Sequence, residues 1–241
     1  MQQPDAHAPD AGFVTVNGTR LWCETAGDGP PLVLIHGSPL DARMWDAQVA
    51  AFAPQHRVIR YDLRGYGRSD PPTALPYRHE DDLAALLDHL GVARAAVLGL
   101  SMGGRVAVDF ALASPARVSA LVLAGSTISG FPWTEDLPAL DAELRAAIAA
   151  GGLPAAREIV AARHWFQPSQ RAHEVRVACL RQIADYSGWH WLHEDPVIAP
   201  DPPAYARLEA LVAPTLIIVG DHDHPDVLAV AAALAARAPR A

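Results

Sequence analysis

Val97-Leu98-Gly99-Leu100-Ser101-Met102-Gly103-Gly104 is the stretch that decides the fold of this chain. It has the form Gly-x-Ser-x-Gly, and it stands where an apolar strand-like run gives way to a helical pattern. This motif is typical of a sharp strand-to-helix turn that lifts a serine hydroxyl clear of the backbone and aims it at a substrate. Glycines flank the serine because side chains at those positions would collide with the tight turn.

On either side of this motif, short apolar runs alternate with longer Ala/Leu-rich helical patterns. That alternation indicates an α/β fold, a mostly parallel sheet with helices on both faces. The expected strands are Phe13–Val16, Arg20–Thr25, Leu32–His36, Arg57–Asp62, Ala95–Leu100, Val118–Ala124 and Pro214–Val219, the first two forming a hairpin around Asn17-Gly18. The expected helices are Asp41–Phe52, Glu80–Leu90, Met102–Ala113 and Val227–Arg237.

The alternation stops between about Ser126 and Ala206, where proline-punctuated helical segments replace the strands. We therefore expect a disordered tail at 1–12, a core formed by 13–125 and 207–241, and a helical cap at 126–206. Aromatic residues concentrate in this cap. The candidates for lining a substrate pocket, which would suit an apolar acyl or ring substrate, are Trp133, Trp165, Phe166 and Trp189. The alternative is that these aromatics form the core of the cap itself.

Composition narrows the classes of protein that this chain represents. Half of its 241 residues are hydrophobic (51%), yet no apolar run approaches the ~18–20 residues that span a bilayer. The net charge of −8 argues against a nucleic-acid partner. Cys23 and Cys179 have no metal-ligand spacing, and free thiols favour a reducing cytoplasm. All 19 basic residues are arginine, which hints at a G+C-rich bacterial gene. The amino terminus lacks a signal-peptide pattern.

The run His36-Gly37-Ser38-Pro39 follows an expected strand and is a candidate for half of an oxyanion hole. A glycine lets the loop turn close to a substrate and frees a backbone N–H for a negatively charged oxygen. The second N–H would be that of Met102, the residue after the serine. The alternative is an ordinary strand-to-helix turn.

Two charged loops also follow expected strands. The first, Tyr61–Asp70, matches neither a Walker-type loop nor a dinucleotide fingerprint, so we expect Asp62 and Arg64 to fix the turn. The second is Gly220-Asp221-His222-Asp223-His224-Pro225-Asp226. A carboxylate at the end of a strand can orient a catalytic imidazole. Its His/Asp density also allows a metal site, but no second ligand cluster supports one, so we expect neither metal nor cofactor.

Taken together, the motifs resemble those of the α/β-hydrolase family, in particular its cap-bearing esterases, enol-lactonases and cofactor-free haloperoxidase-like members. The matching residues are His36-Gly37, Asp62-x-Arg64-Gly65-x-Gly67-x-Ser69, Gly99-x-Ser101-x-Gly103 and Gly220-x-x-Asp223. The resemblance implies that Ser101 is the nucleophile and that Asp223 is the triad acid, with Asp221 and Asp226 as rivals. It also implies that Ser38 and Met102 supply the oxyanion N–H groups. A serine at the elbow, rather than an aspartate, argues against the dehalogenase and epoxide-hydrolase branches.

The catalytic triad of this family also needs a histidine, which by the family order follows the acid after one more strand. The chain ends at Ala241 before such a position, so we expect the triad histidine and the last strand and helix to be absent. Among the histidines present, we expect His36 to be structural and His222 and His224 to be badly placed beside the acid. His164, His190 and His193 fall in the cap.

These observations predict a serine hydrolase that acts on carboxylic esters, lactones or related carbonyl substrates through an acyl-enzyme. Without a triad histidine, the chain as given should be poorly stable and nearly inactive, with an exposed sheet edge that promotes dimerisation. The alternatives are a non-catalytic binding or sensor protein, and an acyltransferase. The expected partner is a small molecule, with no nucleic acid and no membrane.

Overall fold

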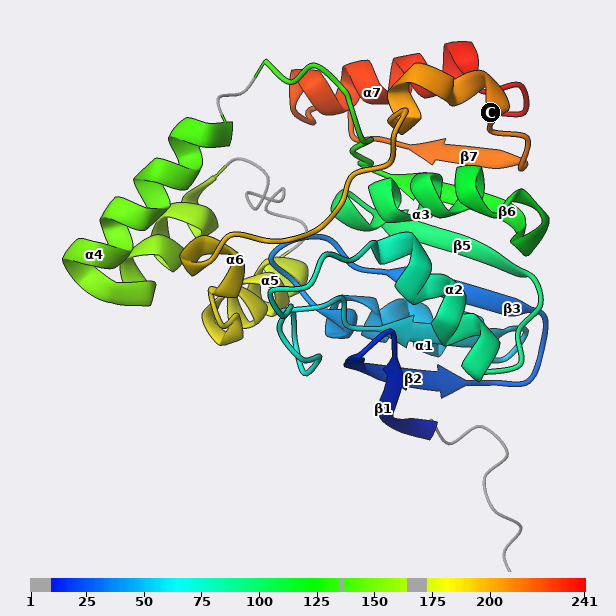
Figure 1. The fold of residues 1–241 in the computed structure, drawn as a ribbon, viewed down its shortest axis with the longest axis horizontal. Coiled ribbons are helices and arrows are strands. Elements are labelled where there is room, and N and C mark those ends of the chain that lie inside the picture. Colours follow the sequence, from blue (N-terminus) through cyan, green and yellow to red (C-terminus); the bar gives the residue numbers. More distant parts are fainter. Residues whose placement is uncertain (1–9, 135–136, 164–172) are drawn as a thin grey trace, which may run out of the picture.

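A computed structural model describes residues 10–134, 137–163 and 173–241, which form one seven-stranded sheet flanked by helices (Figure 1). The strand order is β1-β2-β4-β3-β5-β6-β7. The first two strands run antiparallel, and the remaining five are parallel. The strands are β1 (Asp10–Val16), β2 (Thr19–Ala26), β3 (Pro31–Ile35), β4 (Arg57–Tyr61), β5 (Ala95–Leu100), β6 (Val118–Ala124) and β7 (Thr215–Ile218). The expected α/β-hydrolase sheet is confirmed.

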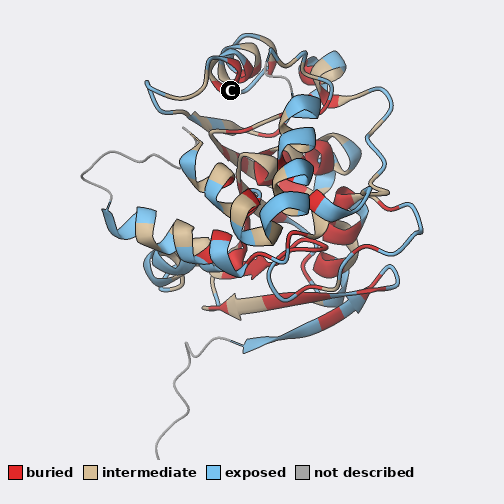
Figure 2. Ribbon diagram, turned by 90° about the vertical axis from the view of Figure 1, so that its left-hand side faces the viewer, coloured by how far each residue is buried: buried red, intermediate tan, exposed pale blue. Residues whose placement is uncertain are grey.

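Helices pack on both faces of this sheet because its central strands are apolar on both sides. On one face, α1 (Asp46–Phe52) contributes Val49 and Phe52 to a cluster with Leu34. The other face packs against α2 (His79–His89), α3 (Met102–Ala113) and α7 (Pro225–Arg237). Figure 2 shows buried strands enclosed by helices whose outer surfaces are exposed.

Helices replace strands between β6 and β7, as the sequence predicts, apart from a single bridge between Tyr77 and Val197 among the residues described. These are α4 (Leu137–Ala162), α5 (His173–Asp185), α6 (Trp189–Leu192) and the 3₁₀ segment η5 (Ala204–Ala210). Figure 1 shows α4, α5 and α6 together beyond the carboxyl ends of the parallel strands. The segment η5 instead packs against α3 and α7, on the core. Of the described helices, none is long and apolar enough to cross a membrane.

Most boundaries lie within two residues of the expected ones, but two elements differ more. The strand β1 begins at Asp10 and pairs with β2, so residues 10–12 belong to the sheet and not to a disordered tail. The helix expected over Asp41–Phe52 is divided into a 3₁₀ turn, η1 (Ala42–Trp45), and α1. The division arises because the Asp41 side chain accepts a hydrogen bond from the Arg43 N–H and caps a separate first turn.

The sheet ends at β7, and one face of that strand is incompletely covered. Leu216 and Ile218 are 56% and 50% exposed. Beside them on the same face, Val122 and Ala124 of β6 are only partly buried. Helix α7 packs against the opposite face, to which Ile217 points. The described structure therefore leaves an apolar face of β7 exposed, and dimerisation through this end of the sheet stays a prediction.

Candidate active site

The turn between β5 and α3 holds Ser101 in an unusual backbone conformation. Its φ and ψ are 53° and −115°, and Asn17 is the only other described non-glycine residue with a positive φ. The Ser101 N–H donates to the Ala124 carbonyl oxygen at 3.0 Å, and its own carbonyl accepts from the Thr127 N–H at 3.1 Å. These bonds fix a conformation that side-chain-bearing residues rarely adopt. The predicted strand–turn–helix context of the motif is confirmed.

Glycine on both sides of Ser101 is a steric requirement. A Cβ on Gly99 would lie 2.3 Å from the carbonyl oxygen of Gly103. A Cβ on Gly103 would lie 2.2 Å from the carbonyl oxygen of Ile35, on the neighbouring strand β3. Both obstacles are backbone atoms that cannot rotate away. The glycines therefore allow α3 to start directly against the sheet.

The loop after β3 runs beside the serine. A Cβ on Gly37 would lie 3.4 Å from the Cβ of Ser101, so this loop and the turn are in contact. The Gly37 N–H points to the Sδ of Met44 at 3.5 Å. In the described part of the chain, the N–H groups of Ser38 and Met102 have no acceptor. Two backbone donors without partners next to a serine are what an oxyanion hole requires.

Tyr66 joins these two donor-bearing residues, although sequence reasoning assigned it no role. Its hydroxyl lies 3.2 Å from the Oγ of Ser38 and 3.6 Å from the Sδ of Met102. The residue sits in the loop after β4, which we expected to be purely structural. An aromatic side chain between two glycines was the only signal for it in the sequence.

His36 is fully buried, and its ring anchors the loop that follows β3. Its Nε2 accepts a hydrogen bond from the Leu63 N–H at 3.0 Å, so its Nδ1 carries the proton and donates to the Gly37 carbonyl at 3.1 Å. Burial lowers the pKa of this imidazole. With both nitrogens engaged, His36 has the structural role expected of it.

The loop after β4 is held by its own charged residues, as expected. The Oδ1 of Asp62 accepts from the Ala42 N–H and the Oδ2 from the Arg68 N–H, both at 2.8 Å. Burial raises the pKa of Asp62. Arg64 forms a buried bidentate ion pair with Asp82 of α2, at 2.6 and 2.7 Å. Both acidic residues therefore fix the fold.

Asp223 lies in the loop between β7 and α7, close to the end of β6. Its Oδ1 accepts from the His224 N–H at 2.9 Å. Its Oδ2 lies 3.4 Å from the position that a Cβ on Gly125 would occupy. Gly125 follows Ala124, the residue that accepts the N–H of Ser101. Ser101 follows β5 and Asp223 follows β7, so both lie at the carboxyl end of the sheet, on either side of β6.

The two rival carboxylates are differently placed. Asp226 is buried and accepts hydrogen bonds from the N–H and the Oγ1 of Thr134, each at 2.9 Å. Its carboxylate thus links α7 to the start of the cap through Thr134. Asp221 is exposed to solvent. Within the described residues no group of three or more His, Cys, Asp or Glu side chains could hold a metal ion.

None of the described histidine rings forms a hydrogen bond with Ser101 or Asp223. His190 stacks on Tyr66 beside the candidate site, but its Nδ1 bonds to the Tyr186 hydroxyl at 2.6 Å. Its Nε2 faces the carboxylate of Asp195 at 3.7 Å. Burial lowers the pKa of His190 to about 4. Its two nitrogens therefore face residues of the cap.

The other histidines that we considered are also placed elsewhere. His222 is exposed. The Nδ1 of His224 accepts from the Asp226 N–H at 3.1 Å and caps α7. The Nδ1 of His193 lies 3.0 Å from a backbone carbonyl oxygen of α6. His164 lies outside the described residues.

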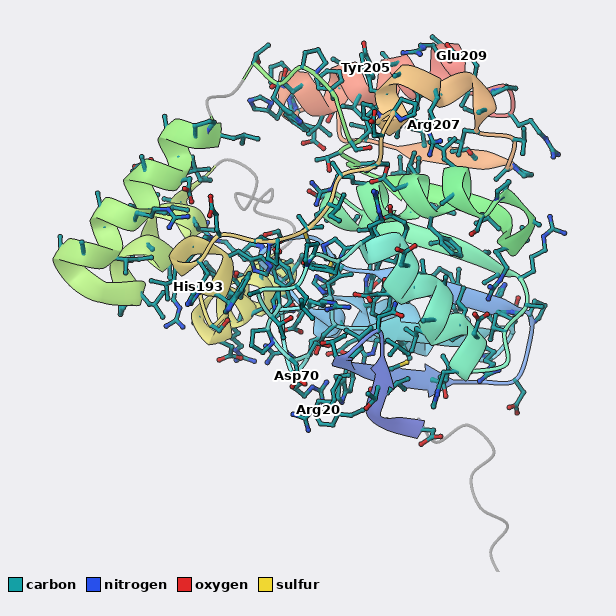
Figure 3. All side chains as sticks on the ribbon, in the orientation of Figure 1. Arg20, Asp70, His193, Tyr205, Arg207 and Glu209 are labelled. Atoms are coloured by element: carbon teal, nitrogen blue, oxygen red, sulfur yellow. The ribbon has the colours of Figure 1, made fainter. Side chains whose placement is uncertain are left out.

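The predicted pocket aromatics fall into two separate places. Trp133 packs edge-on against Phe131, which in turn contacts Tyr205 of η5. Trp189 stacks on His193 and lines an open cleft of about 580 Å³ with residues 72–74 and 193–196. Figure 3 shows His193 beside α6, well apart from Tyr205. Two of the predicted pocket residues lie outside the described residues, namely Trp165 and Phe166.

Comparison with known proteins identifies relatives along most of the chain. The model of a family described as having the alpha/beta hydrolase fold matches residues 30–209. The chain is 32% identical over 202 residues to 3-oxoadipate enol-lactonase 1 of Acinetobacter baylyi, which covers 81% of this chain and 72% of that protein. A shorter match, 41% over 127 residues, is to the dihydrolipoyllysine-residue acetyltransferase component of an acetoin cleaving system from Pseudomonas putida. It covers 50% of this chain, which spans only 34% of that relative's length.

Solved structures show the same architecture. An enol-lactonase from Burkholderia xenovorans LB400 is 28% identical, with a TM-score of 0.74 over 94% of this chain and 87% of that one. A hydrolase from Pseudomonas aeruginosa PA01 is also 28% identical, with a TM-score of 0.70 over 95% and 86%. The sequence and structural likenesses thus point to one family.

Proposed function

The chain belongs to the α/β-hydrolase family, and from that premise we propose that it is a serine hydrolase of carboxylic esters or lactones. One observation carries the proposal: Ser101 sits at a strained strand-to-helix turn beside two N–H donors for which the described structure shows no acceptor. The enol-lactonase relative and the enol-lactonase structure support a lactone or ester as the substrate class. The reaction needs no metal or cofactor.

In the proposed mechanism, the Oγ of Ser101 attacks the substrate carbonyl and forms an acyl-enzyme that water then hydrolyses. The N–H groups of Ser38 and Met102 receive the oxyanion of each tetrahedral intermediate. Donors aimed at that charge in advance are worth several kcal/mol of barrier reduction, about 10²–10³ in rate for one donor. Asp223 would orient the histidine that takes the serine proton.

We also propose that this 241-residue chain turns over its substrate slowly. No described histidine ring bonds to Asp223 or Ser101, so the proton of the serine has no imidazole acceptor among the residues that the structure describes. Loss of a triad base costs about 10⁶ in turnover, whereas the oxyanion hole and substrate binding alone retain about 10³–10⁴ over water. We therefore expect slow, Ser101-dependent acylation of the protein by activated esters.

The test compares Ser101→Ala with the wild-type protein. A fluorophosphonate probe and p-nitrophenyl butyrate would be followed by mass spectrometry and by release of p-nitrophenol. We expect a single adduct on Ser101 and loss of turnover in Ser101→Ala. Ser119→Ala, near the amino end of β6, is the matched control and should behave as the wild type. Equal rates for Ser101→Ala and wild type would refute the nucleophile.

Two alternatives would give different results. A non-catalytic binding protein, which the lack of a described histidine beside Ser101 and Asp223 favours, would bind lactones or esters without any adduct on Ser101. An acyltransferase would form the adduct and pass the acyl group to an added alcohol faster than to water. The match to an acetyltransferase component is the observation behind this second alternative.

A further inference from the structure

Tyr66 is a buried tyrosine whose hydroxyl touches two separate elements of the candidate site. It lies 3.2 Å from the Oγ of Ser38, on the loop after β3, and 3.6 Å from the Sδ of Met102, at the start of α3. These are the two residues whose N–H groups have no acceptor within residues 10–134, 137–163 and 173–241. Burial raises the pKa of Tyr66 to about 12, so the phenol stays protonated and can donate at neutral pH.

The ring of Tyr66 is held firmly between the core and the cap. It stacks on His190 at 4.3 Å between ring centroids and on Tyr186 at 5.4 Å. On its other side it meets the edge of His36 at 5.2 Å. Its N–H donates to the Leu63 carbonyl at 3.0 Å, which anchors the backbone within the loop after β4.

A second buried tyrosine shows that this arrangement is not a general property of tyrosines in this core. Tyr61 is completely buried at the end of β4, and its hydroxyl has no hydrogen-bond partner among the described residues. Tyr61 therefore acts as a large apolar side chain. Tyr66 instead directs its hydroxyl to two residues of the candidate oxyanion hole.

We propose that Tyr66 is a positioning residue, whose hydroxyl holds the Ser38 loop and the start of α3 at the spacing that an oxyanion requires. The proposal rests on the proposed function, because it assumes that Ser38 and Met102 are the oxyanion donors. Such donors must lie 2.7–3.1 Å from the oxyanion, and a displacement of about 0.5 Å already weakens catalysis. Because His190 and Tyr186 of the cap stack on Tyr66, the spacing of the two donors also depends on how the cap packs against the core.

Tyr66→Phe isolates the hydroxyl because it keeps the stacked ring. Tyr186→Phe is the matched control: it removes a hydroxyl from the same stack, but one that bonds to His190 and not to the oxyanion loop. We expect Tyr66→Phe to slow the phosphonylation of Ser101 by the fluorophosphonate about 3- to 10-fold, the effect of losing one neutral hydrogen bond. The concentration of probe at half-maximal rate should change little, and Tyr186→Phe should match the wild type in both quantities.

A second readout does not depend on chemistry at Ser101. The chain has only three methionines, Met1, Met44 and Met102, so methyl-¹³C labelling gives three NMR signals. Met44 reports on the oxyanion loop, because its Sδ accepts from the Gly37 N–H. We expect Tyr66→Phe to shift or broaden the Met44 signal as well as that of Met102, and Tyr186→Phe to leave both in place.

The outcomes separate this proposal from the proposed function. If Ser101→Ala labels or turns over like the wild type, the nucleophile is wrong, and the Met44 signal alone then decides whether Tyr66 positions the loop. An unchanged Met44 signal in Tyr66→Phe overturns the positioning role in either case. Equal slowing of Ser101 labelling in Tyr66→Phe and Tyr186→Phe also overturns it, because the aromatic stack would then matter only for packing.

Discussion

Replacing Ser101 by glycine should make this protein more stable while removing the candidate nucleophile. At φ 53° and ψ −115°, a residue with a Cβ is strained, and such strain costs about 1–3 kcal/mol. Glycine adopts this conformation freely, but it loses about 0.5–1 kcal/mol through the greater entropy of the unfolded chain. The midpoints of these two ranges differ by about 1 kcal/mol, which is the gain that we expect in the free energy of unfolding.

The matched control is Ser101→Ala, which keeps the Cβ and therefore the strain. Its free energy of unfolding should stay within about 0.5 kcal/mol of the wild-type value. Urea unfolding followed by tryptophan fluorescence would measure the midpoint and slope for all three proteins. The gain should appear in the midpoint, with the slope unchanged. If Ser101→Gly is no more stable than Ser101→Ala, the turn is not strained and the reasoning fails.

Three further predictions concern the fold around the site. Asp82→Asn leaves the buried charge of Arg64 without its counter-ion and should lower the free energy of unfolding, measured in urea, by about 3–5 kcal/mol. Asp70→Asn, in an exposed ion pair, should change the urea midpoint little. Gly103→Ala should abolish soluble expression or Ser101 labelling, because its Cβ meets backbone oxygens; wild-type behaviour would contradict that geometry. Burial raises the pKa of Asp109 to about 6 from 3.8, so this group stabilises the fold below pH 4 and loses about 2–3 kcal/mol as the pH rises through 6. Asp109→Asn should remove that part of the pH dependence of unfolding, and an identical pH profile would refute it.

The sequence predicted those parts of the fold and site that depend on local sterics and periodicity. Gly99, Ser101 and Gly103 could be placed in a tight strand-to-helix turn because their spacing occurs between a strand-like run and a helical pattern. The sheet followed from the alternation of apolar runs and helical patterns. Asp226 illustrates the limit: only the structure shows that its carboxylate binds Thr134, far away in sequence.

Contacts made across the fold were invisible in the sequence for the same reason. The pairing of Arg64 with Asp82 and the bridge from Tyr66 to Ser38 depend on how loops and helices pack, which no local pattern encodes. The roles of Ser38, Met102, Asp223 and the cap aromatics stay predictions. Trp133 and Trp189 lie in separate aromatic groups of the described structure, which no local sequence pattern foretells.

At the open face of β7, two forces of different range act between copies of this protein: apolar attraction and charge repulsion. Leu216 and Ile218 offer apolar contact to a second copy, an attraction that acts only at contact. The net charge of −8 repels that copy at longer range. Salt shortens the repulsion, from a Debye length of about 10 Å at 0.1 M to about 3 Å at 1 M, and leaves the apolar contact intact. Self-association measured by light scattering should therefore rise with ionic strength, and Leu216→Glu should suppress the rise.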